Sequence, residues 1–185
     1  MQKENIMKLK KMILALFVSL IVLGSIYPVN ATPIMSESHK NWTSFLSVQN
    51  DGIKFPVIGT SDAEGNRLAV AFVKDRDGTL VYGLSIFIPH NKDFDQFDIY
   101  NCPMQVRVDN NSIQYIFGTI NHKDNWWRID FGDGITRNFL QQAIKGQNLR
   151  IMIMAIDTPI YFNFSLSGFT AASYRAMSLF QQYVN

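Results

Sequence analysis

Short segments in which apolar and polar residues alternate, or in which apolar residues run together, dominate the chain. The segments 104–108 and 160–167 alternate, whereas 149–156 is apolar nearly throughout. Alternation with a period of two is typical of a strand with one buried face, and the apolar run predicts a central strand covered on both faces. Frequent strands with short turns favour a mainly β fold, an antiparallel β-sandwich of jelly-roll or immunoglobulin-like type, over an α/β fold.

Turn signals join several of these segments into hairpins. The sequence DRDG separates 67–74 from 79–89, and DNNS separates 104–108 from 113–120. Asp, Asn and Gly tolerate turn dihedrals, so both connections predict β-hairpins. Further strands are expected at 41–49 and 126–131.

Two segments near the end predict helices instead. The first spans about 137–145, with Thr136 as N-cap and Gly146 just after the helix. The second spans about 171–183, with Thr170 as N-cap. Its apolar residues have helical spacing: Phe169, Ala172, Ala176, Met177 and Phe180. We expect this C-terminal helix to cover a sheet edge or a barrel mouth as an integral part of the fold.

The first 31 residues have the organisation of an export signal. Lysines precede an uninterrupted apolar run over 12–27, and Pro28 followed by Val-Asn-Ala fits cleavage before Thr32. The run is shorter than the roughly 20 residues that span a bilayer, so we expect cleavage and no stable membrane span afterwards. The alternative is an uncleaved membrane anchor.

The rest of the chain is long enough for one domain with a substantial core. Residues 32–41 are polar and lack a period, which predicts a flexible N-terminal arm. A single β-sandwich domain is then expected over 42–185, since no repeat, low-complexity tract or linker divides this range.

Removal of the signal leaves a nearly neutral protein. The full sequence has 17 basic and 15 acidic residues, and loss of four Lys and one Glu leaves 13 against 14. No Lys/Arg cluster remains that could follow a phosphate backbone, so we do not expect nucleic-acid binding. Cys102 is the only cysteine, so no internal disulfide can form and the fold depends on packing.

Trp126 and Trp127 are the candidate contact residues for a ligand or a protein partner. Adjacent residues of a strand point to opposite faces, so both rings cannot enter one core layer. We expect one ring to pack inside, and the other, if exposed, to serve sugar stacking or a protein interface. The alternative is that the second ring lies beneath the C-terminal helix.

No set of residues predicts catalysis, a cofactor or a metal site. Cys102 has no recognisable catalytic base, and His39, His90 and His122 lack the close pairing of a zinc site. The three carboxylates in 93–98 are expected to form a solvated loop, because Ca²⁺ needs six or more oxygens around one point. We therefore expect a non-enzymatic protein.

The C-terminal sequence resembles a known family. The segments FLQQAIKGQNL, RIMIMA and SLSGFTAA, together with MQVRVDNNS over 104–112, resemble the invasion-associated locus B family. The resemblance covers roughly residues 80–180 and implies an exported bacterial β-sandwich protein, with a role in host-cell invasion for some members. Family members usually carry paired cysteines, whereas this chain has only Cys102. The family supplies no active-site motif to carry over.

Three classes of function follow from these observations. The first is an exported, non-enzymatic protein of the periplasm, outer envelope or extracellular space that acts through protein contacts, for which the resemblance implies invasion or virulence. The second is a small-ligand or glycan-binding jelly-roll module. The third is a hydrolase with a noncontiguous site.

Overall fold

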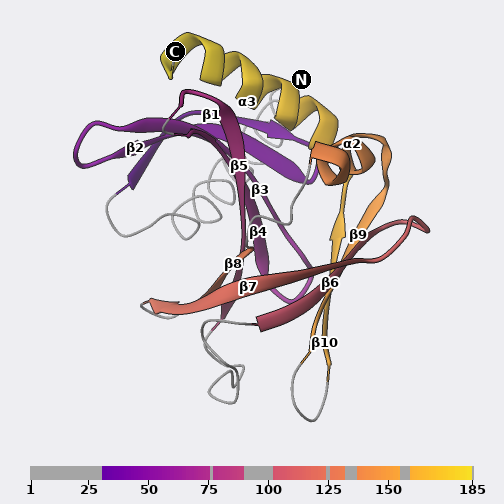
Figure 1. Cartoon of the computed structure of the whole chain (residues 1–185). Coiled ribbons are helices and arrows are strands. Elements are labelled where there is room, and N and C mark those ends of the chain that lie inside the picture. The colour runs from indigo at the N-terminus through magenta and orange to yellow at the C-terminus, as the bar shows by residue number, and fades with distance from the viewer. Residues whose placement is uncertain are drawn as a thin grey trace, which may run out of the picture.

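Ten strands and two helices make up the described part of the chain, which a computed structural model covers over residues 31–75, 77–89, 102–123, 126–131, 137–154 and 159–184 (Figure 1). The strands are β1 (Ala31–His39), β2 (Trp42–Gln49), β3 (Lys54–Ser61), β4 (Arg67–Lys74), β5 (Leu80–Pro89), β6 (Cys102–Val108), β7 (Gln114–Lys123), β8 (Trp126–Phe131), β9 (Asn148–Ile153) and β10 (Ile160–Ser165). The helices are α2 (Arg137–Lys145) and α3 (Phe169–Tyr183).

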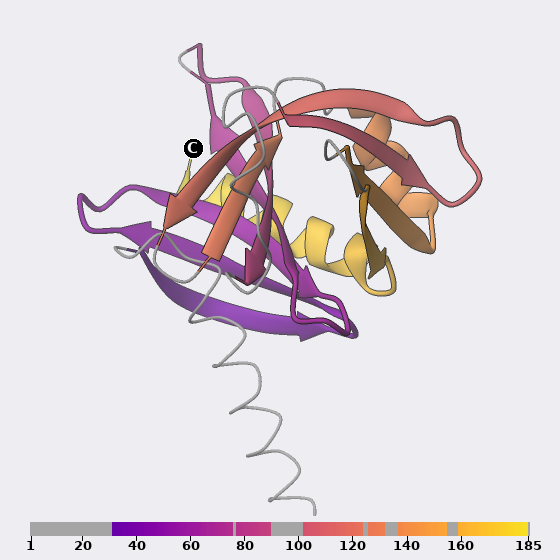
Figure 2. The same ribbon diagram turned by 90° about the horizontal axis from the view of Figure 1, so that it is seen from below.

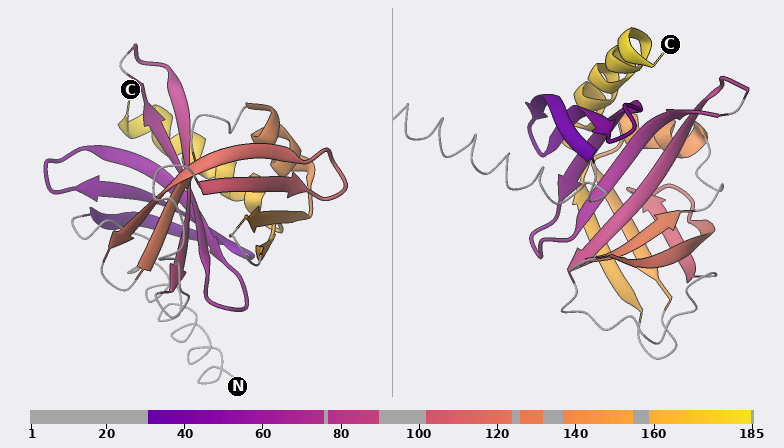
Figure 3. Two further views of the ribbon diagram at one scale, coloured as in Figure 1. Left: turned by 60° about the horizontal axis from the view of Figure 1, so that its bottom comes forward. Right: turned by 90° about the vertical axis from the view of Figure 1, so that its left-hand side faces the viewer.

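All these strands belong to one antiparallel sheet with the order β1-β2-β3-β4-β5-β8-β7-β6-β9-β10. We call β1–β5 the first half and β6–β10 the second half; the pairing of β5 with β8 joins them. Figure 2 shows the two curved halves on opposite sides of the molecule, and Figure 3 shows their strands running in different directions. The predicted mainly β, antiparallel fold with two helices is confirmed, and so are the hairpins β4–β5 and β6–β7.

One core lies between the two halves. It includes inward residues from both: Ile58, Leu68, Ile86, Met104, Ile151 and Phe162. The indole N–H of Trp42 donates to the carbonyl of Ser165 at 2.8 Å, and the backbone N–H of Asn41 donates to the carbonyl of Ser167 at 3.2 Å. These bonds join the start of β2 to the end of β10, two strands far apart in the sheet order. They therefore hold the curved sheet nearly closed.

Helix α3 packs across β1–β4 and contributes to this core (Figure 1). Its buried apolar residues are Phe169, Ala172, Ala176, Leu179 and Phe180. The Phe169 ring meets the Trp42 ring edge-on, with 4.8 Å between the centroids. The predicted apolar stripe is thus confirmed, with Met177 partly buried beside it.

The start of α3 differs from the prediction. The helix begins at Phe169 rather than after Thr170, and Gly168 precedes it with a φ of 96° in the left-handed region. A Cβ at position 168 would also collide with the backbone of His39, so glycine is required there. Thr170 is not the N-cap; its hydroxyl donates to the carbonyl of Ile144 at 2.7 Å and fastens α3 to the end of α2.

Residues 31–39 form the edge strand β1, so the prediction of a flexible arm over 32–41 is wrong. The strand pairs antiparallel with β2 along most of its length and contains a bulge. The guanidinium Nε of Arg175 on α3 lies 3.1 Å from a carboxylate oxygen of Glu37 on this strand. Backbone pairing along an edge needs no alternating apolar residues, which explains why the polar sequence carried no strand signal.

Strand β9 is covered on one face only, and the expectation of burial on both faces is wrong. Its inward residues are buried, whereas the outward residues are an exposed Arg150 and a half-buried Met152. Met154, directly after the strand, is exposed. Methionine is apolar, so outward methionines in a strand look like core residues in the sequence.

Several predictions concern residues outside the described ranges. These are the export signal up to residue 30, the N-cap at Thr136, His90 and the acidic segment 93–98. Among the described residues, no helix has the length and apolar character needed to cross a bilayer.

Candidate functional site

Trp126 and Trp127 lie on opposite sides of β8, as the alternation predicts. Trp127 belongs to the main core, where its ring centroid is 4.7 Å from that of His122. Trp126 is half-buried on the outer side of the sheet, and the guanidinium carbon of Arg67 lies 4.3 Å from its ring centroid. A cation therefore occupies one face of the Trp126 indole, the surface that sugar stacking would need.

Trp126 packs against a second apolar cluster, formed by Phe45, Val57, Ala69 and Phe87 with Phe55 and Ala71 beside them. Four residues that α3 buries belong to the main core instead: Phe169, Ala172, Ala176 and Phe180. Trp126 therefore does not lie beneath the C-terminal helix, which was the alternative that the sequence allowed.

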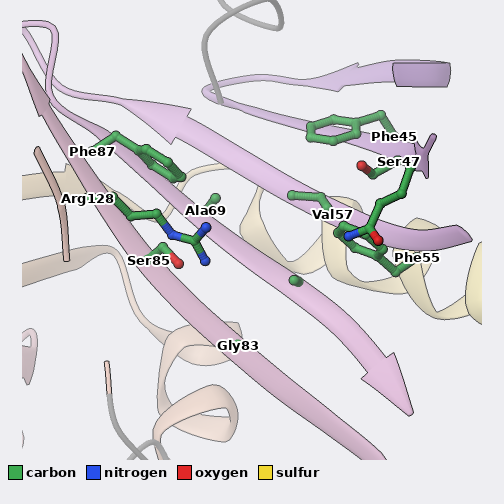
Figure 4. A pocket seen from close by; sticks show the side chains of 11 residues that line it. Phe45, Ser47, Phe55, Val57, Ala69, Gly83, Ser85, Phe87 and Arg128 are labelled. Atoms are coloured by element: carbon green, nitrogen blue, oxygen red, sulfur yellow. The ribbon is translucent and has the colours of Figure 1, made fainter. Parts of the chain in front are cut away.

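The second cluster surrounds a hollow on the outer side of the first half, with a volume of about 140 Å³ (Figure 4). Strands β2, β3, β4, β5 and β8 supply its lining, which is Phe45, Ser47, Gln49, Phe55, Val57, Ala69, Ala71, Gly83, Ser85, Phe87 and Arg128. We call the depression lined by these residues the hollow.

The hollow arises from small residues between aromatic ones. Ala69, Ala71 and Gly83 are its smallest lining residues and lie on β4 and β5, with Ala71 directly opposite Gly83. Phenylalanines lie on the strands around them (Figure 4): Phe45, Phe55 and Phe87. A sheet surface with short side chains in the middle and rings around them is concave at that place.

Polar groups lie on two sides of the hollow. Ser47 is only 1% exposed, and its hydroxyl oxygen has no hydrogen-bond partner among the described residues. On the other side, the guanidinium of Arg128 points toward the hollow (Figure 4). Its Nε lies 2.7 Å from a carboxylate oxygen of Asp130, which also accepts a hydrogen bond from the Ser85 hydroxyl.

The outer side of the second half is different, because large side chains there are open to solvent. Strand register places Tyr115, Gln105, Met152 and Tyr161 in one row across β7, β6, β9 and β10. In the next row Phe117 lies opposite Pro103, whose carbonyl accepts the N–H of Met154. We call these seven residues the aromatic face.

The exposed fractions on the aromatic face are high. They reach 72% for Tyr115, 60% for Phe117, 62% for Tyr161 and 45% for Met154. Isolated exposed apolar residues are normal on a protein surface, but a contiguous group across four strands is typical of an interaction site.

Two arginines border the aromatic face. Arg107 of β6 lies directly opposite Arg150 of β9, and Asn163 of β10 completes this row. Like charges directly opposite each other on neighbouring strands destabilise a sheet. Among the described residues neither guanidinium has an ion-pair partner, and Arg107 donates a hydrogen bond to the side-chain oxygen of Asn110 at 3.4 Å. No ion pair within the described part of the chain therefore neutralises these two positive charges.

The remaining sequence candidates have structural surroundings. Cys102 is buried in the main core, and this burial raises the pKa of its thiol to about 11, so the thiol is neutral near pH 7. A nitrogen of His39 lies 2.8 Å from the Ser44 hydroxyl on β2, whereas His122 lies on β7 beside Trp127. The described residues contain no group of three or more His, Cys, Asp or Glu side chains that could hold a metal ion.

Sequence reasoning did not find the aromatic face, although one signal was available. Tyr161 lies on the polar side of the alternation over 160–167, which predicts an exposed ring. The row itself depends on strand register, which the sequence does not contain. No protein-family model matches this chain, and neither a curated protein nor a solved structure does.

Proposed function

We propose that this chain is an exported, non-enzymatic protein of the bacterial envelope that acts through protein contacts, with the aromatic face as its binding surface. The observation that carries the proposal is the exposure of Tyr115, Phe117 and Tyr161 in adjoining rows of one sheet surface. None of these rings is buried in the core, so core packing does not account for their presence.

The composition of the surface favours a protein partner. Protein interfaces are enriched in Tyr, Phe, Met and Arg and depleted in Lys, Glu and Asp. The aromatic face and the bordering row of Arg107, Arg150 and Asn163 contain the enriched types and none of the depleted ones. Because neither arginine forms an ion pair within the described ranges, the partner is expected to place carboxylates against them.

The envelope setting comes from the sequence. Residues 1–31 have the organisation of an export signal, and the resemblance to the invasion-associated locus B family adds host-cell invasion as the process. Burial of the neutral Cys102 thiol supports the non-enzymatic part of the proposal, since nucleophilic catalysis by cysteine requires a thiolate that substrate can reach.

The experiment is affinity capture from the envelope fraction of the native organism with matched variants. Tyr115→Ser and Tyr161→Ser remove rings from the aromatic face, and Tyr174→Ser removes an equally exposed ring from α3. We expect the first two to lose a partner that the wild type and Tyr174→Ser retain, because central aromatic residues contribute most of the affinity of an interface. Retention of every captured protein by all three variants would reject this surface.

A second candidate is glycan binding, because exposed tyrosine rings also stack on sugars. The same three variants on a glycan array separate the two functions. Glycan binding that depends on Tyr115 and Tyr161, with no protein captured through them, would replace the protein-contact proposal. Trp126 is a weaker platform, because the Arg67 guanidinium already covers one of its faces.

A further inference from the structure

The hollow has the size and lining of a small-ligand site. Its volume is about 140 Å³, and most of its lining is apolar. A cavity of roughly 150 Å³ lined by apolar side chains is known to accept benzene, so this volume suits one aromatic ring or a short alkyl chain.

The space in the hollow is not a by-product of a glycine that the backbone requires. Gly83 has no left-handed φ, and a Cβ at this position would meet only the Cβ of Ala71, at an ordinary 3.9 Å. A larger residue is therefore compatible with the strand, in contrast to Gly168. The missing side chain at position 83 leaves open space in the hollow beside Ala71.

The charges around the hollow favour an anion. Strand register places Arg67 and Arg128 on either side of Phe87, which lines the hollow. Asp130 forms an ion pair with Arg128, but Arg67 has no ion-pair partner among the described residues. One terminal nitrogen of Arg67 is also buried without a hydrogen-bond partner. Arg128 thus lines the hollow and is paired with Asp130. Arg67 lies beyond Phe87, over the Trp126 ring, and is not paired within the described ranges, which leaves one positive charge for an acidic group.

We propose that the hollow binds a small free monocarboxylate whose apolar body lies against Ala69, Ala71 and Gly83 and whose carboxylate lies near Phe87, between Arg128 and Arg67. A guanidinium matches a carboxylate with paired N–H donors, and the terminal nitrogens of Arg128 point toward the hollow (Figure 4). The phenylalanine walls bind the apolar body. This site is separate from the aromatic face and does not depend on the proposed protein contacts.

The test is calorimetric titration of the purified protein with benzoate and hexanoate, each compared with its neutral alcohol, benzyl alcohol or hexanol. We expect both acids to bind, and each alcohol to bind about tenfold more weakly, because the alcohol cannot pair with the guanidinium groups. Absence of acid binding up to about 10 mM, a weak affinity even for fragments, would overturn the proposal.

Matched variants locate the site. Arg128→Gln is expected to weaken acid binding about tenfold and to leave alcohol binding nearly unchanged, because it removes a charge but keeps polar contacts. Arg150→Gln removes an arginine from the other half and is expected to leave acid binding unchanged. Equal effects of the two arginine variants, or equal loss of acid and alcohol in Arg128→Gln, would contradict the assigned carboxylate position.

A second set of variants fills the hollow with a side chain at position 83. Gly83→Leu is expected to abolish binding of both acids, whereas Gly83→Ala, which adds one methyl group in open space, is expected to weaken it about threefold. Circular dichroism checks that each variant is folded, and the alanine variant keeps the test valid if the leucine variant does not fold. Unchanged affinity in Gly83→Ala and a folded Gly83→Leu would place the ligand elsewhere and overturn the proposal.

A peptide arm distinguishes a free acid from the C-terminus of a protein. A tripeptide ending in phenylalanine with a free carboxylate is compared with its C-terminal amide. Tighter binding of the free-carboxylate peptide than of benzoate would mean that the hollow takes a protein C-terminus, and the small-molecule proposal would then be wrong. We expect weaker binding of the peptide, because the hollow has room for only one ring.

Discussion

Helix α3 and the aromatic face use similar side chains in opposite ways. Phe169 and Phe180 on the helix are buried against the core, whereas Tyr115 and Phe117 on β7 are open to solvent. Buried rings stabilise the fold through the apolar surface that they remove from water. Exposed rings remove much less apolar surface from water, and a contiguous group of them fits the proposed interaction surface. The aromatic content of a segment therefore says little until its side of the sheet is known.

Strand β10 shows the same contrast within two residues. Phe162 is 1% exposed and Tyr161 is 62% exposed, although both are large aromatic residues in one short strand. The difference between a buried and an exposed ring depends here on strand alternation alone.

The largest effect is expected from removal of α3. Truncation after Gly168 deletes every buried residue of the helix, including Phe169, which packs on Trp42. Typical domains are stable by only about 5–15 kcal/mol, so we expect the truncated protein to lose cooperative unfolding. Urea denaturation followed by fluorescence measures this. An unchanged midpoint would mean that α3 is a detachable segment. Its buried rings would then contribute no more to stability than exposed rings do.

The next prediction compares the two neighbours in β10. Phe162→Ala is expected to lower the free energy of unfolding by about 3–5 kcal/mol, because it leaves a cavity in the main core. Tyr161→Ala is expected to change it by no more than about 0.5 kcal/mol, because the ring is exposed. Equilibrium denaturation of both variants gives the values. Similar losses would show that the aromatic face supports the fold rather than a partner.

The pH dependence of stability at Cys102 shows whether water is excluded from the inner face of β6. Burial raises its thiol pKa from the ordinary 9.0 to about 11, so the folded state favours the protonated thiol. Below about pH 9 the thiol is protonated in both states, and this contribution to the free energy of unfolding is fully present. As pH rises through about 11, the free energy of unfolding falls by roughly 2–3 kcal/mol at most. The measurement is the free energy of unfolding from pH 8 to 11 for the wild type minus that for Cys102→Ala, which cancels the titration of tyrosines. A difference that stays flat would mean that the thiol is solvated.

The smallest effect is expected from Arg150 on the outer side. Arg150→Glu replaces a like-charge pair with an opposite-charge pair beside Arg107, so we expect a gain of about 0.2–1 kcal/mol in stability. Arg150→Gln, which only removes the repulsion, is expected to gain less. Denaturation midpoints compare the three proteins. Destabilisation by Arg150→Glu would show that the arginine has a structural role. It would also contradict the proposal that an acidic partner binds the two arginines.

Local signals in the sequence predict much of the fold. The strand β4, the strand β8 and the helix α2 have the same bounds in the structure as in the sequence patterns, and the turns DRDG and DNNS join the expected hairpins. Such features depend on side-chain period, turn dihedrals and helix ends, which residues close in sequence determine. The opposite directions of Trp126 and Trp127 follow from the same local rule.

The candidate sites depend on contacts between distant segments. The polar strand β1 forms because it pairs with β2 along the edge of the sheet. The outward Met152 of β9 differs from the core residues of the strand only in the side of the sheet on which it lies. The aromatic face combines four strands whose sheet order, β7-β6-β9-β10, differs from their chain order.

By itself, then, the sequence determined the strands with clear alternation, the two helices and the side-chain directions within each element, because these follow from local periodicity. Only the tertiary structure decided which outward positions stay exposed, that Arg67 covers Trp126, and that five strands surround the hollow. The physical reason is that register and sheet curvature arise from pairing between segments far apart in the chain, and these interactions leave no local pattern.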